Sequence, residues 1–232
     1  MKHMIPSAAA AVVCSAVMVF GQTQAAPQST PTAAPAAQPT PQPAARPASP
    51  VGTSATQVAG TWGKNARGGD AYQNGKWIEI TYGRPIMRGR DVWGTGADYA
   101  KGLLINGAKV WRAGANVSTR LNTEVPLMIG GKTVPVGEYS LFIDTKSPTD
   151  WTLIVSSWGA KKSGGDQTPD TLWGSFNYTP DKDVARVPMT MGKLPVSFDE
   201  LTWNFVDMRN DSGKLAIMWD TVIATAPFTV AK

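Results

Sequence analysis

The chain has 232 residues, a formal net charge of +5, one histidine and one cysteine. The last two are His3 and Cys14, so residues 27–232 contain neither an imidazole nor a thiol. That absence excludes from this part of the chain a Ser-His-Asp triad, a Cys-His pair, a histidine-ligated metal site and a disulfide framework.

The first 26 residues are typical of a secretory signal peptide. Lys2 and His3 provide a basic start, and an apolar stretch follows at residues 8–20. Small residues then end the segment at positions 25–26. The apolar stretch is shorter than the roughly 20 residues that span a bilayer. We therefore predict an exported protein, periplasmic or secreted, that is not integral to the membrane.

Residues 27–57 are rich in proline and alanine. They include 8 Pro and 8 Ala among 31 residues, and Arg46 is their only charge. Such a composition cannot bury a core and favours extended, polyproline-like conformations of about 3 Å per residue. We predict a disordered linker here, either a tether that holds the domain away from a membrane or partner, or a passive leader.

Residues 58–232 are predicted to form a single all-β domain, an antiparallel β-sandwich or a jelly-roll-like fold. The length suits one domain with a sizeable core. In the segment 77–82, Ile78, Ile80 and Tyr82 alternate with the residues between them, as in a strand with one face in a core. The basic residues of this region are too few and too scattered to indicate nucleic-acid binding.

Hairpin patterns follow this first strand. Two glycines at 130–131 separate 125–129 from 132–136, which is the clearest short hairpin signal in the chain. Residues 138–143 and 151–156 can pair across the turn between them. Further strand patterns cover residues 184–191, 201–208 and 215–225. Strands spaced about ten residues apart with Gly, Pro and Asp between them are typical of an antiparallel sandwich.

Two long loops interrupt the strand patterns. The first, residues 83–115, contains the best candidate for a short helix, at 98–104, although Gly102 weakens it. The second covers residues 157–171. Long ordered loops on a rigid sheet are where binding sites usually lie.

Four groups of residues point to a known family. In chain order they are YGRP at 82–85 followed by RGR at 88–90 and WG at 93–94, KVWRAGAN at 109–116, GEYSLF at 137–142, and WGSFNY at 173–178. Together they resemble a bacterial family of secreted proteins known as domain of unknown function 2911, over roughly residues 58–230. The resemblance implies a β-sandwich-like exported domain, and brings no activity, substrate or catalytic residue. Between Trp93 and Lys109 a longer glycine-rich stretch replaces the family's short link.

The first long loop carries a run of basic residues. Arg84, Arg90 and Arg112 are its central members, and a guanidinium offers a planar fork for carboxylate or phosphate. If the three converge, they can bind an anionic ligand such as a uronic acid, a phospholipid head group or an acidic peptide. Alternatively, Arg84 and Arg112 fix the loop by pairing with backbone carbonyls and with carboxylates such as Glu79 or Glu138.

Nine tryptophans are many for one domain. Those outside the predicted strands or at their ends are Trp62, Trp93, Trp111, Trp158 and Trp173. Their rings can serve as platforms for sugar faces or can anchor loops by packing. Trp111 and Trp158 are the two that we predict to be exposed. The tryptophans within strands, which we predict to be core residues, are Trp77, Trp151, Trp203 and Trp219.

These patterns lead to a set of predicted ligand-binding residues. The set is Arg84, Arg90, Trp111, Arg112, Asn116, Tyr139 and Trp158. The leading hypothesis is a non-enzymatic exported domain that binds an envelope or extracellular ligand, a glycan or an anionic group, through residues 84–116. The turn aspartates show no dense calcium-binding pattern, so we predict neither a metal nor a cofactor.

Two other functions remain open. One is a glycan hydrolase, because glycoside cleavage needs only two carboxylates about 5 to 9.5 Å apart. The available acids include Glu79, Glu124, Glu138, Asp199 and Glu200, and no catalytic pair is assigned. The other is an architectural envelope protein whose partner is another protein, which the proline-rich segment fits equally well.

Overall fold

The structure is a computed structural model, and it describes residues 47–232. The predicted signal peptide, residues 1–26, lies outside the described residues, as does most of the predicted linker. No helix within residues 47–232 is long and apolar enough to cross a membrane.

The β domain begins earlier in the chain than the sequence predicts. Strand β1 (Val51–Val58) pairs along its whole length with β4 (Lys76–Gly83). The predicted linker therefore ends too late, because its last seven residues, 51–57, belong to a sheet. Gly52 and Val58 face the interior of the domain, but the proline-rich composition before them hides this short strand pattern.

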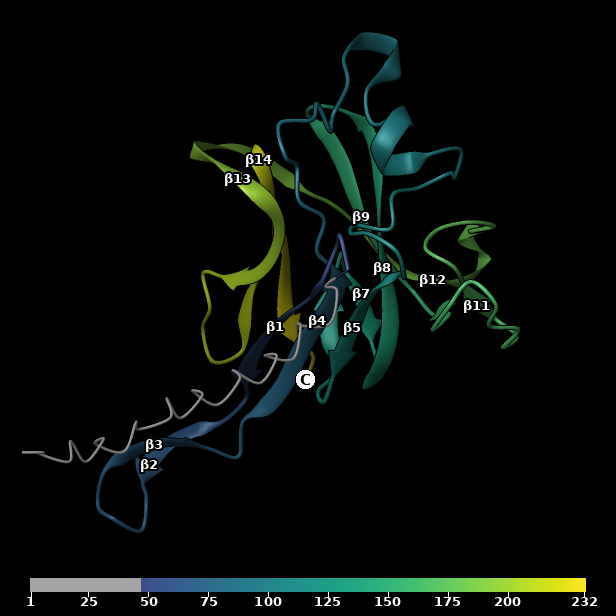
Figure 1. The fold of residues 1–232 in the computed structure, drawn as a ribbon. Coiled ribbons are helices and arrows are strands. Elements are labelled where there is room, and N and C mark those ends of the chain that lie inside the picture. The colour runs from purple at the N-terminus through teal and green to yellow at the C-terminus, as the bar shows by residue number, and fades with distance from the viewer. Residues whose placement is uncertain (1–46) are drawn as a thin grey trace, which may run out of the picture. The chain divides into compact units, whose positions relative to one another are not determined.

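The larger sheet has six antiparallel strands in the order β1-β4-β5-β8-β9-β12 (Figure 1). Its members beyond the first two are β5 (Thr119–Thr123), β8 (Gly137–Ser147), β9 (Asp150–Ser156) and β12 (Asp183–Pro188). Each strand pairs with the one that precedes it in this sheet, so the order follows the chain. The predicted pairing of residues 138–143 with 151–156 is confirmed.

The smaller sheet has the order β13-β14-β6-β7. Its strands are β6 (Leu127–Ile129), β7 (Lys132–Val134), β13 (Thr190–Val206) and β14 (Ser212–Val230). The predicted hairpin at Gly130 and Gly131 is confirmed, since Ile129 pairs with Lys132 and both glycines have positive φ, 57° and 74°. Such angles suit the tight turns that match strand twist.

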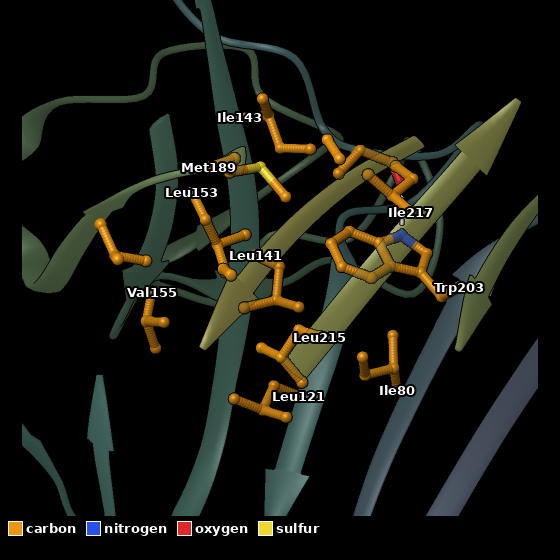
Figure 2. Close-up of a cluster of buried hydrophobic side chains, with 14 of the residues drawn as sticks. Ile80, Leu121, Leu141, Ile143, Leu153, Val155, Met189, Trp203, Leu215 and Ile217 are labelled. Atoms are coloured by element: carbon orange, nitrogen blue, oxygen red, sulfur yellow. Dashed lines mark hydrogen bonds between the residues drawn. The ribbon is translucent and has the colours of Figure 1, made fainter. Parts of the chain in front are cut away.

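The core lies between the two sheets. From the larger sheet, Ile80, Leu121 and Leu141 point inward, and each is fully buried. Figure 2 shows these side chains facing Trp203 and Leu215 of the smaller sheet. The fold is thus an antiparallel β-sandwich, as the alternating patterns predict.

The chain crosses between the sheets immediately after β4. The Leu201 N–H donates to the Pro85 carbonyl at 3.0 Å, and the Met87 N–H donates to the Asp199 carbonyl at 2.7 Å. The segment after β4 is therefore held against β13. These bonds fix where the first long loop starts.

The predicted helix at 98–104 forms only as two short turns. They are η1 (Gly96–Asp98) and the π-helical turn η2 (Lys101–Ile105). Ala100 and Asn106 have φ of 61° and 45°, and a left-handed residue at each end of η2 prevents the turns from joining into one helix.

The second long loop covers part of the outer face of the larger sheet. Two short strands, β10 (Gly159–Ala160) and β11 (Thr171–Leu172), pair in parallel within it. Below them lies a second apolar cluster, which contains Phe142, Ile154 and Tyr178. A further short turn, η3 (Pro180–Lys182), leads from this region into β12.

Tyr178 lies in a polar network beside this cluster. Its hydroxyl donates to a carboxylate oxygen of Asp183 at 2.6 Å, and Arg186 contacts both groups. Burial, together with the neighbouring carboxylate, raises the pKa of the Tyr178 phenol well above its usual 10.0. The folded state therefore favours the protonated phenol.

We expect the stability of the domain to fall in alkali partly through Tyr178. Because its pKa is higher in the folded state, this stabilisation is complete below pH 10 and is lost as the pH rises through the raised pKa. Urea unfolding measured between about pH 8 and pH 11 should show a shallower alkaline loss for Tyr178→Phe than for the unmodified protein. If both proteins lose the same stability in alkali, the effect comes from other phenols. Tyr99 and Tyr139 also have raised pKa values.

The predictions for the strand tryptophans hold with one exception. Trp151, Trp203 and Trp219 are buried, with exposed fractions of 1%, 1% and 5%. Trp77 is wrong as a core residue, because 49% of it is exposed. It lies on the outer face of the larger sheet, opposite to the buried Ile78 and Ile80.

Candidate basic pocket

Four indole rings, two from the first long loop and two from strands β9 and β14, pack together in one cluster. Trp93, Trp111, Trp151 and Trp219 have ring centroids 5.4 to 6.3 Å apart, and Trp111 is stacked on Trp219 with an angle of 15° between their planes. Edge-on and offset contacts of this kind each contribute about 0.5–1.5 kcal/mol beyond area burial. The cluster is a rigid apolar floor on which the loop rests.

Trp111 reaches the floor because its backbone joins the larger sheet. Its N–H donates to the Ile143 carbonyl at 2.8 Å, and the Ile143 N–H donates back at 2.9 Å. Its side chain is 1% exposed, so the prediction that Trp111 is exposed is wrong. The pairing of Trp111 with Ile143 is an isolated bridge in an irregular loop. It produces no periodic pattern in the sequence, so the burial of Trp111 could not be predicted.

Arg112 follows Trp111 and is partly buried. One of its terminal N–H groups donates to the Asn116 carbonyl at 2.8 Å, and its guanidinium lies 5.9 Å from the centre of the Phe176 ring. Gly174 packs directly against the guanidinium, where a Cβ would come within 2.7 Å of a nitrogen. Burial lowers the pKa of Arg112 from its usual 12.5, but the side chain stays cationic at neutral pH.

Arg112 and Arg90 line one pocket with a volume of about 240 Å³, called the arginine pocket below. Asn116 and Ser49 contribute polar edges, and the Asn116 side-chain amide donates to the Ser49 carbonyl at 3.4 Å. The apolar lining comes from Pro85, Leu103, Leu104, Trp111 and Trp219, together with the nearby backbone of Gly114 and Ala115. The pocket therefore combines two cations with an apolar wall.

Arg90 is held by its own loop. Its Nε donates to the Met87 carbonyl at 3.0 Å, and one terminal nitrogen donates to the Ile86 carbonyl at 2.7 Å. Among the ion pairs between residues 47–232, none includes Arg90 or Arg112. Both guanidiniums thus hold backbone carbonyls in place, and neither has a carboxylate partner in this part of the chain.

Arg84 does not join the other two arginines. It pairs with Glu200 of β13 at 2.5 Å and does not line the arginine pocket. Its Nε is buried without a hydrogen-bond partner in the described part of the chain. The alternative interpretation, in which Arg84 fixes the loop through a carboxylate, describes its contacts, although the carboxylate is neither Glu79 nor Glu138.

Tyr139 and Trp158 also lie away from the pocket. The Tyr139 hydroxyl donates to the Pro135 carbonyl at 3.0 Å, near the start of β8 and four residues before the bridge from Ile143 to Trp111. The Trp158 indole donates to the Thr179 carbonyl at 3.1 Å, and Lys182 lies 4.2 Å above its ring. Trp158 is partly buried and anchors the second long loop.

The arginine pocket includes residues that sequence reasoning assigns elsewhere. The sequence around Trp219 shows only the alternation that is typical of a strand facing the core, and Ser49 lies in the segment predicted as linker. Leu103 and Leu104 belong to the weak helix candidate. No motif joins these three places, because they meet only when the sheets pack.

The carboxylates named for a hydrolase do not all line one pocket. Glu138 forms an ion pair with Arg120. Glu79 and Glu124 line a pocket of about 410 Å³ beside Trp77, and Glu124 accepts a hydrogen bond from the Trp77 N–H at 2.8 Å. No group of three or more potential metal-ligating side chains occurs within the described residues. The hydrolase hypothesis stays a prediction.

The fold and this pocket define an antiparallel β-sandwich with a basic pocket over a tryptophan cluster. Over residues 69–228 the chain matches the family described as "Protein of unknown function (DUF2911)", and it belongs to that family. The predicted family is thereby confirmed. Searches among curated proteins and among solved structures found no match.

Proposed function

We propose that this protein is an exported, non-enzymatic domain that binds a small anionic ligand in the arginine pocket. The ligand class is a carboxylate or phosphate attached to a compact apolar group. The observation that carries the proposal is that Arg90 and Arg112 line one pocket and neither pairs with a carboxylate within residues 47–232.

The charge balance of the pocket supports an anion. Removing a guanidinium from water is unfavourable unless an opposite charge or hydrogen-bond acceptors replace the solvent. Within residues 47–232 the Arg112 guanidinium has one hydrogen-bond acceptor, the Asn116 carbonyl, so a ligand can accept from its other N–H groups. Arginine presents these donors as a rigid fork that fits carboxylate and phosphate.

The apolar wall supports a ligand larger than a free ion. Trp111 and Trp219 lie in the floor, and Leu103, which is 52% exposed, stands at the side. A volume of about 240 Å³ holds a head group and a small ring or short chain. A uronic acid at the end of an envelope glycan and a phosphorylated head group both have this chemistry.

We expect Arg112→Gln to abolish ligand-induced stabilisation. A ligand at 100 times its Kd stabilises a folded protein by about 2.7 kcal/mol, which for this size raises the Tm by roughly 5–10 °C. Thermal unfolding of the purified protein with inorganic phosphate, glucuronate or phenyl phosphate measures this shift. Arg90→Gln should only reduce the shift, because Arg90 is exposed and the partly buried Arg112 remains.

Arg88→Gln is the matched control for charge. Arg88 is exposed, lies two residues from Arg90 and does not line the pocket, so the variant loses one positive charge and should keep the full shift. If none of the three probes shifts the Tm, or if Arg88→Gln and Arg112→Gln lose the shift equally, the arginine pocket is not an anion site.

A further inference from the structure

The β2–β3 hairpin presents an exposed tryptophan. Strands β2 (Thr61–Lys64) and β3 (Asp70–Gln73) form a two-stranded sheet beyond the end of β1 and β4 (Figure 1). Trp62 on β2 is 76% exposed, more than any other tryptophan of the chain. An indole so open to water has no packing role that explains it.

The ring of Trp62 is held in place by Tyr72. The two residues are opposite each other in the hairpin, with their rings edge-to-face at 5.6 Å. Tyr72 is itself closely packed: it lies against Gly60 and Gly75, where any Cβ would come within 2.6 Å of its ring. Its hydroxyl accepts from the Gly60 N–H at 2.7 Å and donates to Asn210 at 2.5 Å. Trp62 is thus pre-organised with most of its surface free.

A pocket of about 660 Å³ lies beside these two rings. Its polar side chains include the Gln57 amide and the Arg209 guanidinium, neither of which forms a side-chain hydrogen bond or an ion pair with another described residue. Together with Asn210, they offer both donors and acceptors around an aromatic face. No carboxylate lines this pocket.

A second exposed indole continues the same surface. Gln57 is paired across the sheet with Trp77, and Ala55, two residues earlier on the same face of β1, lines the pocket beside Trp77. That pocket also contains Glu79 and the Asn122 amide. Two aromatic faces, each next to planar amides, therefore follow one another along β1.

We propose that Trp62 and Trp77 form a binding surface for a neutral oligosaccharide, separate from the arginine pocket, with which it shares no lining residue. The C–H face of a pyranose is apolar and fits the electron-rich face of an indole, while its hydroxyls both donate and accept hydrogen bonds. Glu79 and Glu124 repel acidic sugars from the Trp77 end, so that end of the surface favours uncharged rings.

Calorimetric titration of the purified protein with cellohexaose, chitohexaose and mannohexaose tests the proposal. At least one hexasaccharide should bind. Trp62→Ala should then weaken its Kd by about tenfold or more, and Trp77→Ala should weaken it as well. Trp62→Tyr, which retains an aromatic face, should stay within about threefold of the unmodified protein. Arg112→Gln should leave this binding unchanged.

Three outcomes would overturn the glycan surface. The first is that no hexasaccharide binds. The second is that binding persists unchanged in Trp62→Ala. The third is that a photocrosslinker placed at Thr61 in living cells captures a protein at the hairpin and excess hexasaccharide does not compete. Since Trp62→Ala leaves the arginine pocket intact, its phosphate or glucuronate response tests the two sites separately.

Discussion

Gly83→Ala is expected to destabilise the domain by about 3 kcal/mol or more and to disrupt the arginine pocket. A Cβ at this position would lie 1.9 Å from the backbone carbonyl oxygen of Ala115. Real atoms do not approach so closely, and the obstacle is backbone, which cannot rotate away. The Ala115 N–H also donates to the Gly83 carbonyl at 3.0 Å, so any movement that relieves the clash weakens this bond.

The clash acts directly on the proposed site. Ala115 and Asn116 both line the arginine pocket, and the Asn116 carbonyl accepts the hydrogen bond that orients Arg112. A displaced Ala115 therefore releases the guanidinium. We expect Gly83→Ala to lose ligand-induced stabilisation even at temperatures where it remains folded.

Urea unfolding of Gly83→Ala, compared with Gly164→Ala, measures the effect. Gly164 is exposed, and an added Cβ there meets no atom within 4 Å, so its variant should differ from the unmodified protein by less than about 0.5 kcal/mol. If the two variants are equally stable, the close contact between the end of β4 and residues 113–116 does not exist in solution.

Trp111→Ala is the second large change, with an expected loss of about 3–5 kcal/mol. Its ring is fully enclosed and contacts Trp93, Trp151 and Trp219. Truncation removes the stacked partner of Trp219 and leaves a cavity that the sheet backbone cannot close. Because domains of this kind have only about 5–15 kcal/mol of total stability, this loss is a large fraction of it.

Trp62→Ala is the matched control for Trp111→Ala. Both variants lose one indole, but Trp62 is 76% exposed, so its loss should change the free energy of unfolding by at most about 0.5–1 kcal/mol, through its contact with Tyr72. Far-UV circular dichroism during urea unfolding is the suitable measurement, because each variant alters the tryptophan fluorescence. Equal stabilities would show that the four-ring cluster contributes nothing to folding.

Gly83 and Trp111 both hold the segment of the chain between β4 and β5. The loop leaves the larger sheet at Gly83, touches β13, rests Trp111 on β8 and returns to Gly83 through Ala115. Backbone hydrogen bonds therefore hold this loop at both of its ends. We expect a pocket formed by a loop held in this way to keep its shape without a ligand.

Alternating apolar positions by themselves indicate the antiparallel sandwich and many of its strands, although not β1 or β5. Ile78, Ile80 and Tyr82 face the core as their period of two predicts, and Gly130 with Gly131 turns the chain where the hairpin signal lies. These are local properties, since strand alternation and turn geometry depend on residues a few positions apart. The sequence likewise indicates the family, which the match over residues 69–228 confirms.

Only the tertiary structure decided which functional residues meet. Arg90 and Arg112 share a pocket while Arg84 pairs with Glu200, and Trp77, which was predicted to be a core residue, faces water. Each outcome depends on what packs against the residue from a distant part of the chain. Alternation states that two faces of a strand differ, but which face is covered, and by what, is set by contacts between sheets and loops that no local pattern encodes.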